Sequence, residues 1–295
     1  MFGFLNIYKP TGMTSHDVVG FLRKITKIKQ IGHTGTLDPF AEGVLPIAIG
    51  KATRLIEFLQ DDKEYLAEIS FGHSTTTYDR EGEVIFAEQP VKKVELEMLK
   101  EALKLFEGEI SQVPPIYSAI KVKGKKLYEY AREGKEVEIE SRKVFIEKIE
   151  LKSFDAEKQT AEVLIKCSKG TYIRSIAHDL GQNLGCGAYL SKLVRTQAGD
   201  FLVEKTVDLE SLKSLLDVEK NLISPLDVLP LEKIEIDDEE HSKVLVGMPI
   251  KINDNKYLQL TQKKENNFVL LIYNKAVSAI ARVDGDYIKV KKVFE

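Results

Sequence analysis

The chain is poor in cysteine, and it lacks both a long hydrophobic run and a glycine-rich nucleotide-binding motif. Its two cysteines, Cys167 and Cys186, are too few for a disulfide framework or a cysteine-based metal site. No apolar run approaches the roughly 18 residues that cross a bilayer, and the first residues have no features of a secretory signal. We therefore expect a reduced, cytoplasmic protein that binds no metal, no membrane and no small-molecule cofactor.

Hydrophobic residues make up 43% of the 295 positions and charged residues 30%, as in an ordinary globular protein with ample core. This length predicts one or two domains. The composition changes at residues 224–242, where Ser-Pro and a run of acidic residues are typical of an exposed boundary. We expect one domain over residues 1–230 and a second over residues 231–295.

The net charge of −3 argues weakly against a nucleic-acid partner, because binding to nucleic acid depends on neutralising phosphates. However, the charge is unevenly distributed. Residues 61–110 hold 13 acidic and 6 basic side chains, whereas residues 111–132 hold 1 and 5, and residues 243–292 hold 4 and 10. Such basic stretches permit RNA binding without demonstrating it, since lysine-rich segments are also ordinary solvated faces.

Residues 32–43 (GHTGTLDPFAEG) form a loop, marked by three glycines, a proline and two threonines. One carboxylate, Asp38, lies among residues that restrict the backbone, because Pro39 fixes its own φ and favours an extended Asp38. The loop is either a structural turn in which Asp38 accepts backbone hydrogen bonds or a site that presents a carboxylate for chemistry. Spacing alone leaves both interpretations open.

Two-residue alternation and helical spacing predict the elements around this loop. Strands are expected over residues 4–8, 44–49, 65–71 and 161–167. Helices are expected from Thr14-Ser15 onward, over 53–59, over 94–107 and after Thr171. Arg174 falls on the first turn of the last helix. Since an arginine there faces the positive end of the helix dipole, we expect it to have a carboxylate partner.

The segment 111–142 differs from its surroundings. Gln-Val-Pro-Pro at 112–115 excludes regular helix and central strand. Four lysines follow, at Lys121, Lys123, Lys125 and Lys126, and tyrosines are interleaved with them. This mixture suits a segment that grips phosphates and stacks bases, although a solvated helical arm has the same composition.

The last part of the chain contains short strand-like runs separated by turn residues. These runs cover residues 257–260, 268–273, 276–282 and 287–293. Closely spaced short strands of this kind predict a small β-barrel.

Several stretches resemble the TruB family of pseudouridine synthases. Residues 32–54 (GHTGTLDPFAEGVLPIAIGKATR) are similar to the family's catalytic motif, residues 167–175 (CSKGTYIRS) to its second motif and residues 9–19 (KPTGMTSHDVV) to its first. Residues 111–142 resemble the RNA-gripping insertion of the stand-alone bacterial enzymes. Residues 246–249 (VGMP) open a stretch similar to the PUA domain, an RNA-binding module.

This resemblance implies an α+β fold with a mixed, largely antiparallel central sheet flanked by helices, plus a small C-terminal PUA β-barrel. It also implies that Asp38 is the catalytic nucleophile and that Arg174 pairs with it. From the residues alone, Lys9 reads as a surface residue and the histidine at position 16 as part of a helix start.

The resemblance assigns the substrate-binding residues as well. In the family, the motif histidine, here His33, fills the space left by a flipped base, and a tyrosine that fits Tyr65 stacks on that base and handles its C5 proton. Tyr172 and Leu193 align with positions that line the uridine pocket. Arg195 is a candidate phosphate contact. Patterning alone makes His33 a structural loop residue and Tyr65 and Leu193 ordinary core residues.

The family reaction breaks the bond from ribose to a uracil nitrogen, turns the base and rejoins it through C5. No atom leaves and no redox change occurs, so the reaction requires neither metal nor cofactor. It does require a nucleophile that is ionised at neutral pH, and an arginine beside Asp38 favours the charged carboxylate. The target base must also leave its stack.

We therefore expect a monomeric, stand-alone tRNA pseudouridine synthase that acts on the T-arm uridine conventionally numbered 55. One alternative is an RNA-guided synthase of ribosomal RNA, and another is a non-catalytic tRNA-binding or RNA-folding protein of the same fold. Asp38, Tyr65 and Arg174 favour catalysis, and the lysine-rich segment and short C-terminal domain favour the stand-alone type.

Overall fold

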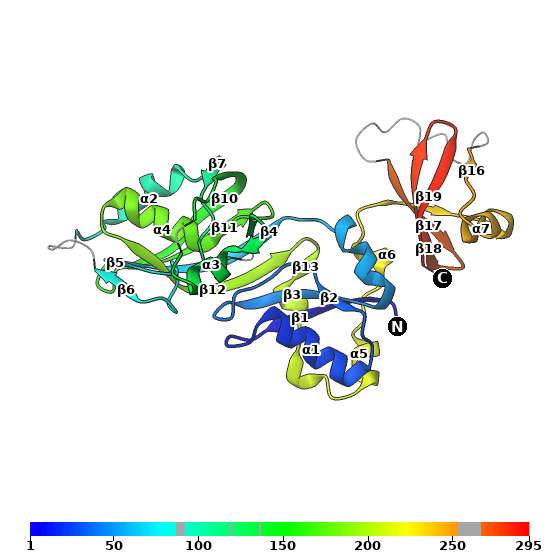
Figure 1. Cartoon of the computed structure of the whole chain (residues 1–295), viewed down its shortest axis with the longest axis horizontal. Helices are drawn as coiled ribbons and strands as arrows, with labels where there is room; N and C mark the ends of the chain where they lie inside the picture. Colours follow the sequence, from blue (N-terminus) through cyan, green and yellow to red (C-terminus); the bar gives the residue numbers. More distant parts are fainter. Residues whose placement is uncertain (87–91, 119, 136, 253–266, 295) are drawn as a thin grey trace.

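A computed structural model describes residues 1–86, 92–118, 120–135, 137–252 and 267–294. In these residues a large sheet with flanking helices is joined to a smaller sheet formed by the last part of the chain (Figure 1). The two ends of the chain meet where the sheets join, because the rings of Phe2 and Phe294 stack with centroids 5.5 Å apart.

The large sheet contains ten strands of the described residues. Its main path runs through β14 (Val207–Asp208), β1 (Gly3–Lys9), β3 (Glu42–Ile49), β12 (Ala188–Ala198), β4 (Lys63–Phe71), β11 (Thr160–Cys167), β10 (Arg142–Asp155) and β7 (Gly108–Gln112). Two short strands pair at its side, β2 (Ile31–His33) with β3 and β13 (Phe201–Leu202) with β12. Two hairpins stand apart, β5 (His73–Thr75) with β6 (Val84–Phe86) and β8 (Lys121–Val122) with β9 (Lys125–Lys126).

The pairing within the large sheet is mostly antiparallel, and β1–β14 and β3–β12 are its parallel pairs among the described residues. The predicted mixed, largely antiparallel sheet is therefore confirmed. The strand predicted over residues 65–71 from its alternating hydrophobic residues is β4, in which every second residue from Tyr65 to Phe71 is buried. Strand β3 lies in the middle of the sheet and is buried almost throughout.

The α-helices of the described residues are α1 (Ser15–Thr26), α2 (Leu96–Lys104), α3 (Leu127–Arg132), α4 (Ile173–Leu184), α5 (Leu215–Lys220), α6 (Pro225–Val228) and α7 (Asp238–Leu245). Helices α1, α2 and α4 contact the large sheet, whereas α7 contacts the smaller one. Helix α1 begins as predicted, because the Thr14 hydroxyl accepts from Asp17 N–H in a capping box. Helix α4 ends at Gly185, which takes a positive φ of 71°.

The helix predicted over 53–59 is instead a 3-10 helix, η1 (Gly50–Phe58), and two shorter ones follow later, η2 (Val203–Lys205) and η3 (Leu209–Ser211). Helices α2 and α4 pack together on one face of the large sheet, and α1 lies near β1 and β3 (Figure 1).

The smaller sheet has the order β15 (Glu232–Glu235), β17 (Phe268–Tyr273), β18 (Ala276–Asp284), β19 (Tyr287–Val293) and β16 (Ile250–Lys251). Strands β17, β18 and β19 match three of the predicted runs. The strand expected over 257–260 lies outside the described residues. In those that are described, the sheet is an open half-barrel, so closure into a PUA barrel stays a prediction.

The acidic stretch after residue 231 is more ordered than its composition predicts. Its first part is β15, in which Ile234 is buried between exposed or half-buried charged neighbours. Asp237 then caps α7 by accepting from Glu240 N–H at 2.9 Å. Acidic residues at the start of a helix also favour the helix dipole. The acidic run therefore forms the first strand and the first helix of the C-terminal part of the chain, and the domain division at residue 230 stays a prediction.

The two sheets share a hydrophobic core. Buried residues of the large sheet, such as Phe4 and Val44, belong to one cluster with Leu270, Ile280 and Phe294 of the smaller sheet. Lysine and arginine side chains of η1 reinforce this contact, since Lys51 Nζ donates to Phe294 O at 3.1 Å and Arg54 Nη1 to the carbonyl before it at 2.9 Å. The junction is therefore a packed interface.

Candidate active site

Asp38 and Arg174, which are 136 positions apart in the sequence, meet in the structure. Asp38 lies in the loop between β2 and β3, and Arg174 lies on the first turn of α4. The Nε atom of Arg174 is 2.9 Å from Oδ2 of Asp38. The arginine side chain is 5% exposed and that of Asp38 34% exposed. The guanidinium is thus held inside the protein while the carboxylate is accessible from solvent.

Arg174 has a second carboxylate partner that sequence reasoning missed. Its Nη1 lies 3.3 Å from Oδ2 of Asp79, a residue that is 3% exposed. The Asp79 side chain also accepts hydrogen bonds from the Thr77 hydroxyl and from Glu81 N–H. The bond from Glu81 N–H is a local Asx-type contact, which gives an aspartate at position 79 a short-range structural role. Its long-range partner left no signal in the sequence.

The same guanidinium contacts the segment 111–142. Nη2 of Arg174 donates to Tyr117 O at 3.1 Å. Beside it, Ser175 Oγ donates to Val113 O at 2.9 Å. The start of the insertion is therefore tied to the first turn of α4, where Arg174 reaches Asp38.

Burial raises the pKa of Asp38 above the ordinary aspartate value. The Arg174 charge opposes this shift, the neighbouring Asp79 adds to it, and Lys9 opposes it less strongly. The arginine alone, which is what the sequence indicates, favours the ionised form. The net direction is upward because the partial burial of the carboxylate outweighs that favourable charge.

Residues of the first motif hold the backbone on both sides of Asp38. Lys9 is fully buried, and its Nζ donates to Pro39 O at 3.3 Å and to two carbonyls of its own loop. The Ser15 hydroxyl donates to Leu37 O at 3.1 Å and accepts from Leu37 N–H at 2.8 Å. Burial lowers the pKa of Lys9 to about 8. The interpretation of Lys9 as a surface residue was wrong.

Tyr65 and Leu193 lie close together on the same face of neighbouring strands. Leu193 of β12 pairs with Ala67 of β4, and Ala67 is two residues from Tyr65 on the same strand, so all three side chains are on one face. Tyr65 is 7% exposed and Leu193 5%. Burial raises the pKa of the Tyr65 phenol, and the nearby Arg195 opposes that shift.

Arg195 does not fit the role predicted for it. It is fully buried, and its guanidinium points into the protein, where Nε donates to Val44 O at 2.6 Å and Nη2 to Gly35 O at 3.1 Å. A phosphate contact needs a guanidinium that RNA can reach, so the prediction of a backbone contact for Arg195 is corrected.

His33 and Tyr172 lie at the ends of elements that border the Asp38 loop. His33 ends β2 and is half-buried, and burial lowers the pKa of its imidazole. Tyr172 directly precedes α4, and its main chain exchanges two hydrogen bonds with the Gln112 side chain. The guanidinium of Arg142 lies 4.9 Å from the centre of the Tyr172 ring.

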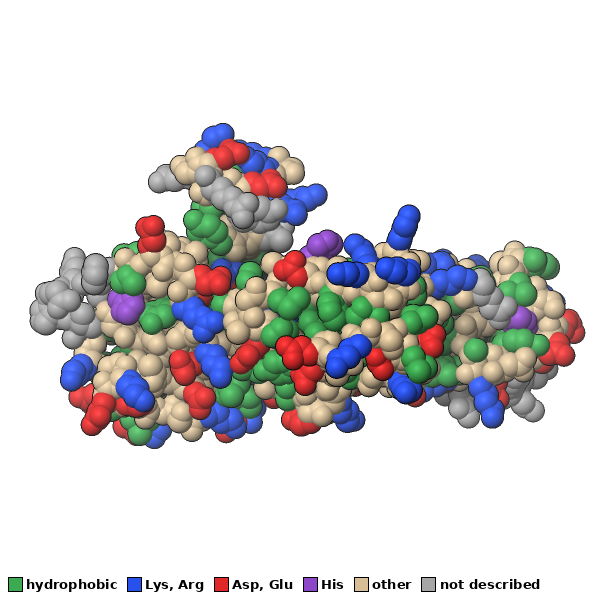
Figure 2. All heavy atoms as spheres, turned by 90° about the horizontal axis from the view of Figure 1, so that it is seen from below, with side chains coloured by type: hydrophobic (Ala, Val, Ile, Leu, Met, Phe, Trp, Pro, Cys, Tyr) green, Lys and Arg blue, Asp and Glu red, His purple; other side chains and the backbone are tan. Residues whose placement is uncertain are grey.

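The insertion projects from the rest of the molecule as a separate knob (Figure 2). Lys121 and Lys123 are exposed on its hairpin. Lys125 pairs with Glu133 and lies 4.9 Å from the centre of the Tyr130 ring, and Lys126 is half-buried. A cavity of about 590 Å³ separates the hairpin from residues 137–142. Lysines 121 and 123 are thus the members of this set most available to a partner.

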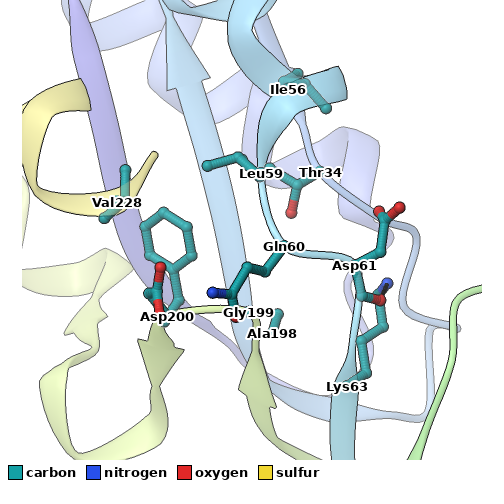
Figure 3. A pocket seen from close by; sticks show the side chains of 11 residues that line it. Thr34, Ile56, Leu59, Gln60, Asp61, Lys63, Ala198, Gly199, Asp200 and Val228 are labelled. Atoms are coloured by element: carbon teal, nitrogen blue, oxygen red, sulfur yellow. Dashed lines mark hydrogen bonds between the residues drawn. The ribbon is translucent and has the colours of Figure 1, made fainter. Parts of the chain in front are cut away.

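A smaller pocket lies near the start of the Asp38 loop, lined by Thr34, Lys63 and the turn at Gly199 (Figure 3). Its volume is about 10 Å³, which is room for one water molecule at most. Asp38 is not among its lining residues. This pocket is therefore too small to receive a nucleotide.

Two family models match consecutive parts of the chain. Residues 23–173 match the TruB family pseudouridylate synthase N-terminal domain, and residues 174–234 match the tRNA pseudouridylate synthase B C-terminal domain. The chain belongs to the TruB family of pseudouridylate synthases and is thus a pseudouridine synthase, an isomerase.

Within this family, the chain is similar over its whole length to proteins named tRNA pseudouridine synthase B. The protein of that name from Caldanaerobacter subterraneus is 44% identical, with 99% of each chain covered. That from Carboxydothermus hydrogenoformans is 43% identical, with 100% of this chain and 99% of the relative covered.

Solved structures give the same fold. A chain of an H/ACA ribonucleoprotein bound to a substrate RNA containing 2′-deoxyuridine superposes with a TM-score of 0.71 at 25% identity, covering 100% of this chain and 85% of that one. A chain of a Cbf5–Nop10–Gar1 complex gives 0.69 at 26% identity, with the same coverage. The α+β pseudouridine synthase fold expected from the sequence is therefore confirmed.

None of the helices in the described ranges is long and apolar enough to cross a membrane. Over the same ranges, no three His, Cys, Asp or Glu side chains are grouped as metal ligands.

Proposed function

We propose that this chain is a stand-alone tRNA pseudouridine synthase that converts the T-arm uridine at position 55 to pseudouridine. The observation that carries the proposal is the Asp38–Arg174 pair, in which a buried guanidinium lies 2.9 Å from a solvent-accessible carboxylate. The full-length relatives named tRNA pseudouridine synthase B support the choice of tRNA as substrate. We also expect a cytoplasmic monomer.

In this proposal Asp38 is the nucleophile and Arg174 its orienting partner. The ionised Asp38 oxygen either attacks the ribose or removes a sugar proton, after which the bond to the ring nitrogen breaks. The uracil turns and rejoins through C5. Arg174 fixes the direction of the carboxylate with its Nε and favours the charged form. Asp79 and the Tyr117 carbonyl in turn fix the guanidinium.

The flipped base is assigned to the space beside Tyr65 and Leu193. Tyr65 offers a ring for stacking and a hydroxyl for proton transfer, and Leu193 an apolar wall next to it. His33, at the edge of the Asp38 loop, takes the space that the base leaves in the RNA. Tyr172, packed against Arg142, forms part of the pocket rim.

The RNA backbone is assigned to the exposed lysines of the insertion and to the C-terminal sheet, which we propose is part of a PUA domain over residues 231–295. The catalytic domain then covers residues 1–230. On the face drawn in Figure 2, lysine and arginine side chains gather on the side from which the insertion projects. This arrangement suits a substrate that spans the knob and the Asp38 loop.

RNA-guided modification is the second candidate, because the similar solved structures include H/ACA ribonucleoproteins. The relatives at 43–44% identity over the full length argue for the stand-alone type. Purified protein with transcribed tRNA decides between them. We expect complete conversion of one T-arm uridine without guide RNA or another protein, read by chemical mapping of pseudouridine. Conversion that needs a guide RNA would support the second candidate, and binding without conversion would indicate a non-catalytic RNA-binding protein.

A further inference from the structure

Arg195 is a fully buried cation near the centre of the large sheet. In the part of the chain that the structure describes, it has no carboxylate partner at ion-pair distance. Its Nη1 is buried and makes no regular hydrogen bond with any described residue. A buried charge without a counter-ion is costly, so the position needs an explanation beyond packing.

The backbone of Arg195 lies where three strands meet. It pairs in parallel register with Gly43 of β3 and in antiparallel register with Tyr65 of β4. A register shift in β12 follows immediately, between Arg195 and Gln197. Irregularities of this kind re-aim side chains next to active sites. Gly43 has a φ of +104°, and a Cβ there would lie 2.3 Å from Arg195 O. The chain thus brings the strand after Asp38 unusually close to Arg195.

The Arg195 side chain links both ends of the Asp38 loop and comes from the residue paired with Tyr65. One bond reaches Gly35, three residues before Asp38, and another reaches Val44, six residues after it. Tyr65 is the direct cross-strand neighbour of Arg195 on β4, so the two side chains lie on the same face of the sheet. A single side chain therefore lies between the loop of the proposed nucleophile and the proposed proton acceptor.

We propose that Arg195 is a positioning residue that holds Tyr65 against the Asp38 loop and stabilises the phenolate form of Tyr65 during the reaction. The proposal rests on the assignment of Tyr65 to the C5 proton.

Arg195 would assist the transfer of the C5 proton to Tyr65. After the new bond from C5 to the ribose has formed, C5 carries both the ribose and its hydrogen. The C5–H bond breaks and the proton goes to the Tyr65 phenolate oxygen. The electron pair forms the C5=C6 double bond, the C6=N1 pair moves to N1, and N1 takes a proton from water. The phenol returns its proton to solvent. A cation beside the phenolate favours it over the neutral phenol, which burial otherwise favours.

The composition of the chain permits a direct test of the Tyr65 ionisation that does not depend on enzyme activity. The protein has 11 tyrosines and no tryptophan, so near-ultraviolet absorbance reports tyrosine ionisation without overlap from indole. The difference between the protein and its Tyr65→Phe variant isolates Tyr65. We expect Arg195→Met to move the Tyr65 ionisation to higher pH and Arg195→Lys to leave it close to that of the unaltered protein. Circular dichroism checks that each variant is folded at each pH. Should Arg195→Met fail to fold, Arg195→Gln is the second neutral variant, because it retains a donor for a loop carbonyl.

Kinetics supply the second readout. The assays are single-turnover reactions in which the protein is in saturating excess over tRNA. We expect Arg195→Met to slow pseudouridine formation by roughly 10²- to 10⁴-fold, the usual scale for loss of a general acid–base group. The double variant with Tyr65→Phe should be no slower than Tyr65→Phe alone, and tRNA affinity should not change. Lys158→Met, at an exposed position paired with Asp155, controls for the loss of one positive charge from the chain.

An unchanged Tyr65 ionisation in the folded neutral variants would overturn the proposal, as would a loss of tRNA affinity with a normal rate at saturation. If the unaltered protein converts no uridine, the proposed function fails. The absorbance titration still reports in that case whether Arg195 stabilises the Tyr65 phenolate.

Discussion

At the scale of single residues, the charges around Asp38 act in opposite directions. Arg174 favours the carboxylate, whereas burial and Asp79 favour the neutral acid, and the pKa is raised on balance. The reaction needs the ionised form. Activity is therefore expected to fall with decreasing pH through a value above the ordinary aspartate pKa of 3.8.

The variant Asp79→Asn tests this balance. Removing the like charge next to Asp38 lowers the pKa of Asp38, so the acid limb of the single-turnover rate should move to lower pH. The rate on the plateau should fall at the same time, because Arg174 loses a partner that fixes it. The measurement is the pH profile of pseudouridine formation at saturating protein. An acid limb that stays in place or moves to higher pH would contradict this account of Asp38.

At the scale of elements, the contact between β3 and β12 depends on a glycine. Gly43→Ala adds a Cβ at a φ of +104° and 2.3 Å from Arg195 O, so one strand must shift. Gly108→Ala is the matched control, because Gly108 has a φ of +85° but open space around the added atom. The control carries only the left-handed backbone cost of about 1–2 kcal/mol.

Gly43→Ala should therefore cost about 1–3 kcal/mol more than Gly108→Ala, which is the usual range for overpacking. Urea titration of both variants measures the difference in free energy of unfolding. Equal losses of stability would show that the β3–β12 junction is not as tightly packed as the structure has it.

The elements near the Asp38 loop could be predicted because local rules suffice for them. The capping threonine of α1, the alternation in β4 and the glycine after α4 each leave a short-range signal. The acidic strand β15 and helix α7 were missed because their isoleucines are few and their aspartates and glutamates resemble a linker. The 3-10 helix η1 packs against the C-terminal sheet. This contact could not be predicted, because it depends on residues more than 230 positions away in the sequence.

The site was predictable to the same extent. Asp38, Arg174 and Tyr65 lie in or near motifs. The helix dipole predicts a carboxylate partner for Arg174, and the family resemblance identifies that partner as Asp38. The locations of Asp79 and Arg195 were not predictable from spacing. Nothing in the sequence near Arg195 distinguishes a guanidinium that points inward from one that points to solvent, because only the three-strand junction decides it.

At the scale of the whole molecule, the C-terminal sheet packs against the large one through a shared core. Phe294 is 5% exposed and belongs to the core that both sheets share. Phe294→Ala should lower the free energy of unfolding by about 3–5 kcal/mol, as for other buried aromatics. Tyr287→Ala, at a position 42% exposed in the same sheet, should change it little. Thermal unfolding of both variants is the measurement. Retention of full stability in Phe294→Ala would show that the two sheets are independent.

The central claim concerns the carboxylate of Asp38. It is tested most directly by mapping pseudouridine in a T-arm stem-loop RNA after incubation with the unaltered protein, with Asp38→Asn and with the exposed control Asp200→Asn. We expect conversion at one uridine by the unaltered protein and by Asp200→Asn. Asp38→Asn should form no pseudouridine while binding the RNA with similar affinity. Normal conversion by Asp38→Asn would contradict the account, because no ionised oxygen would then be available at that position.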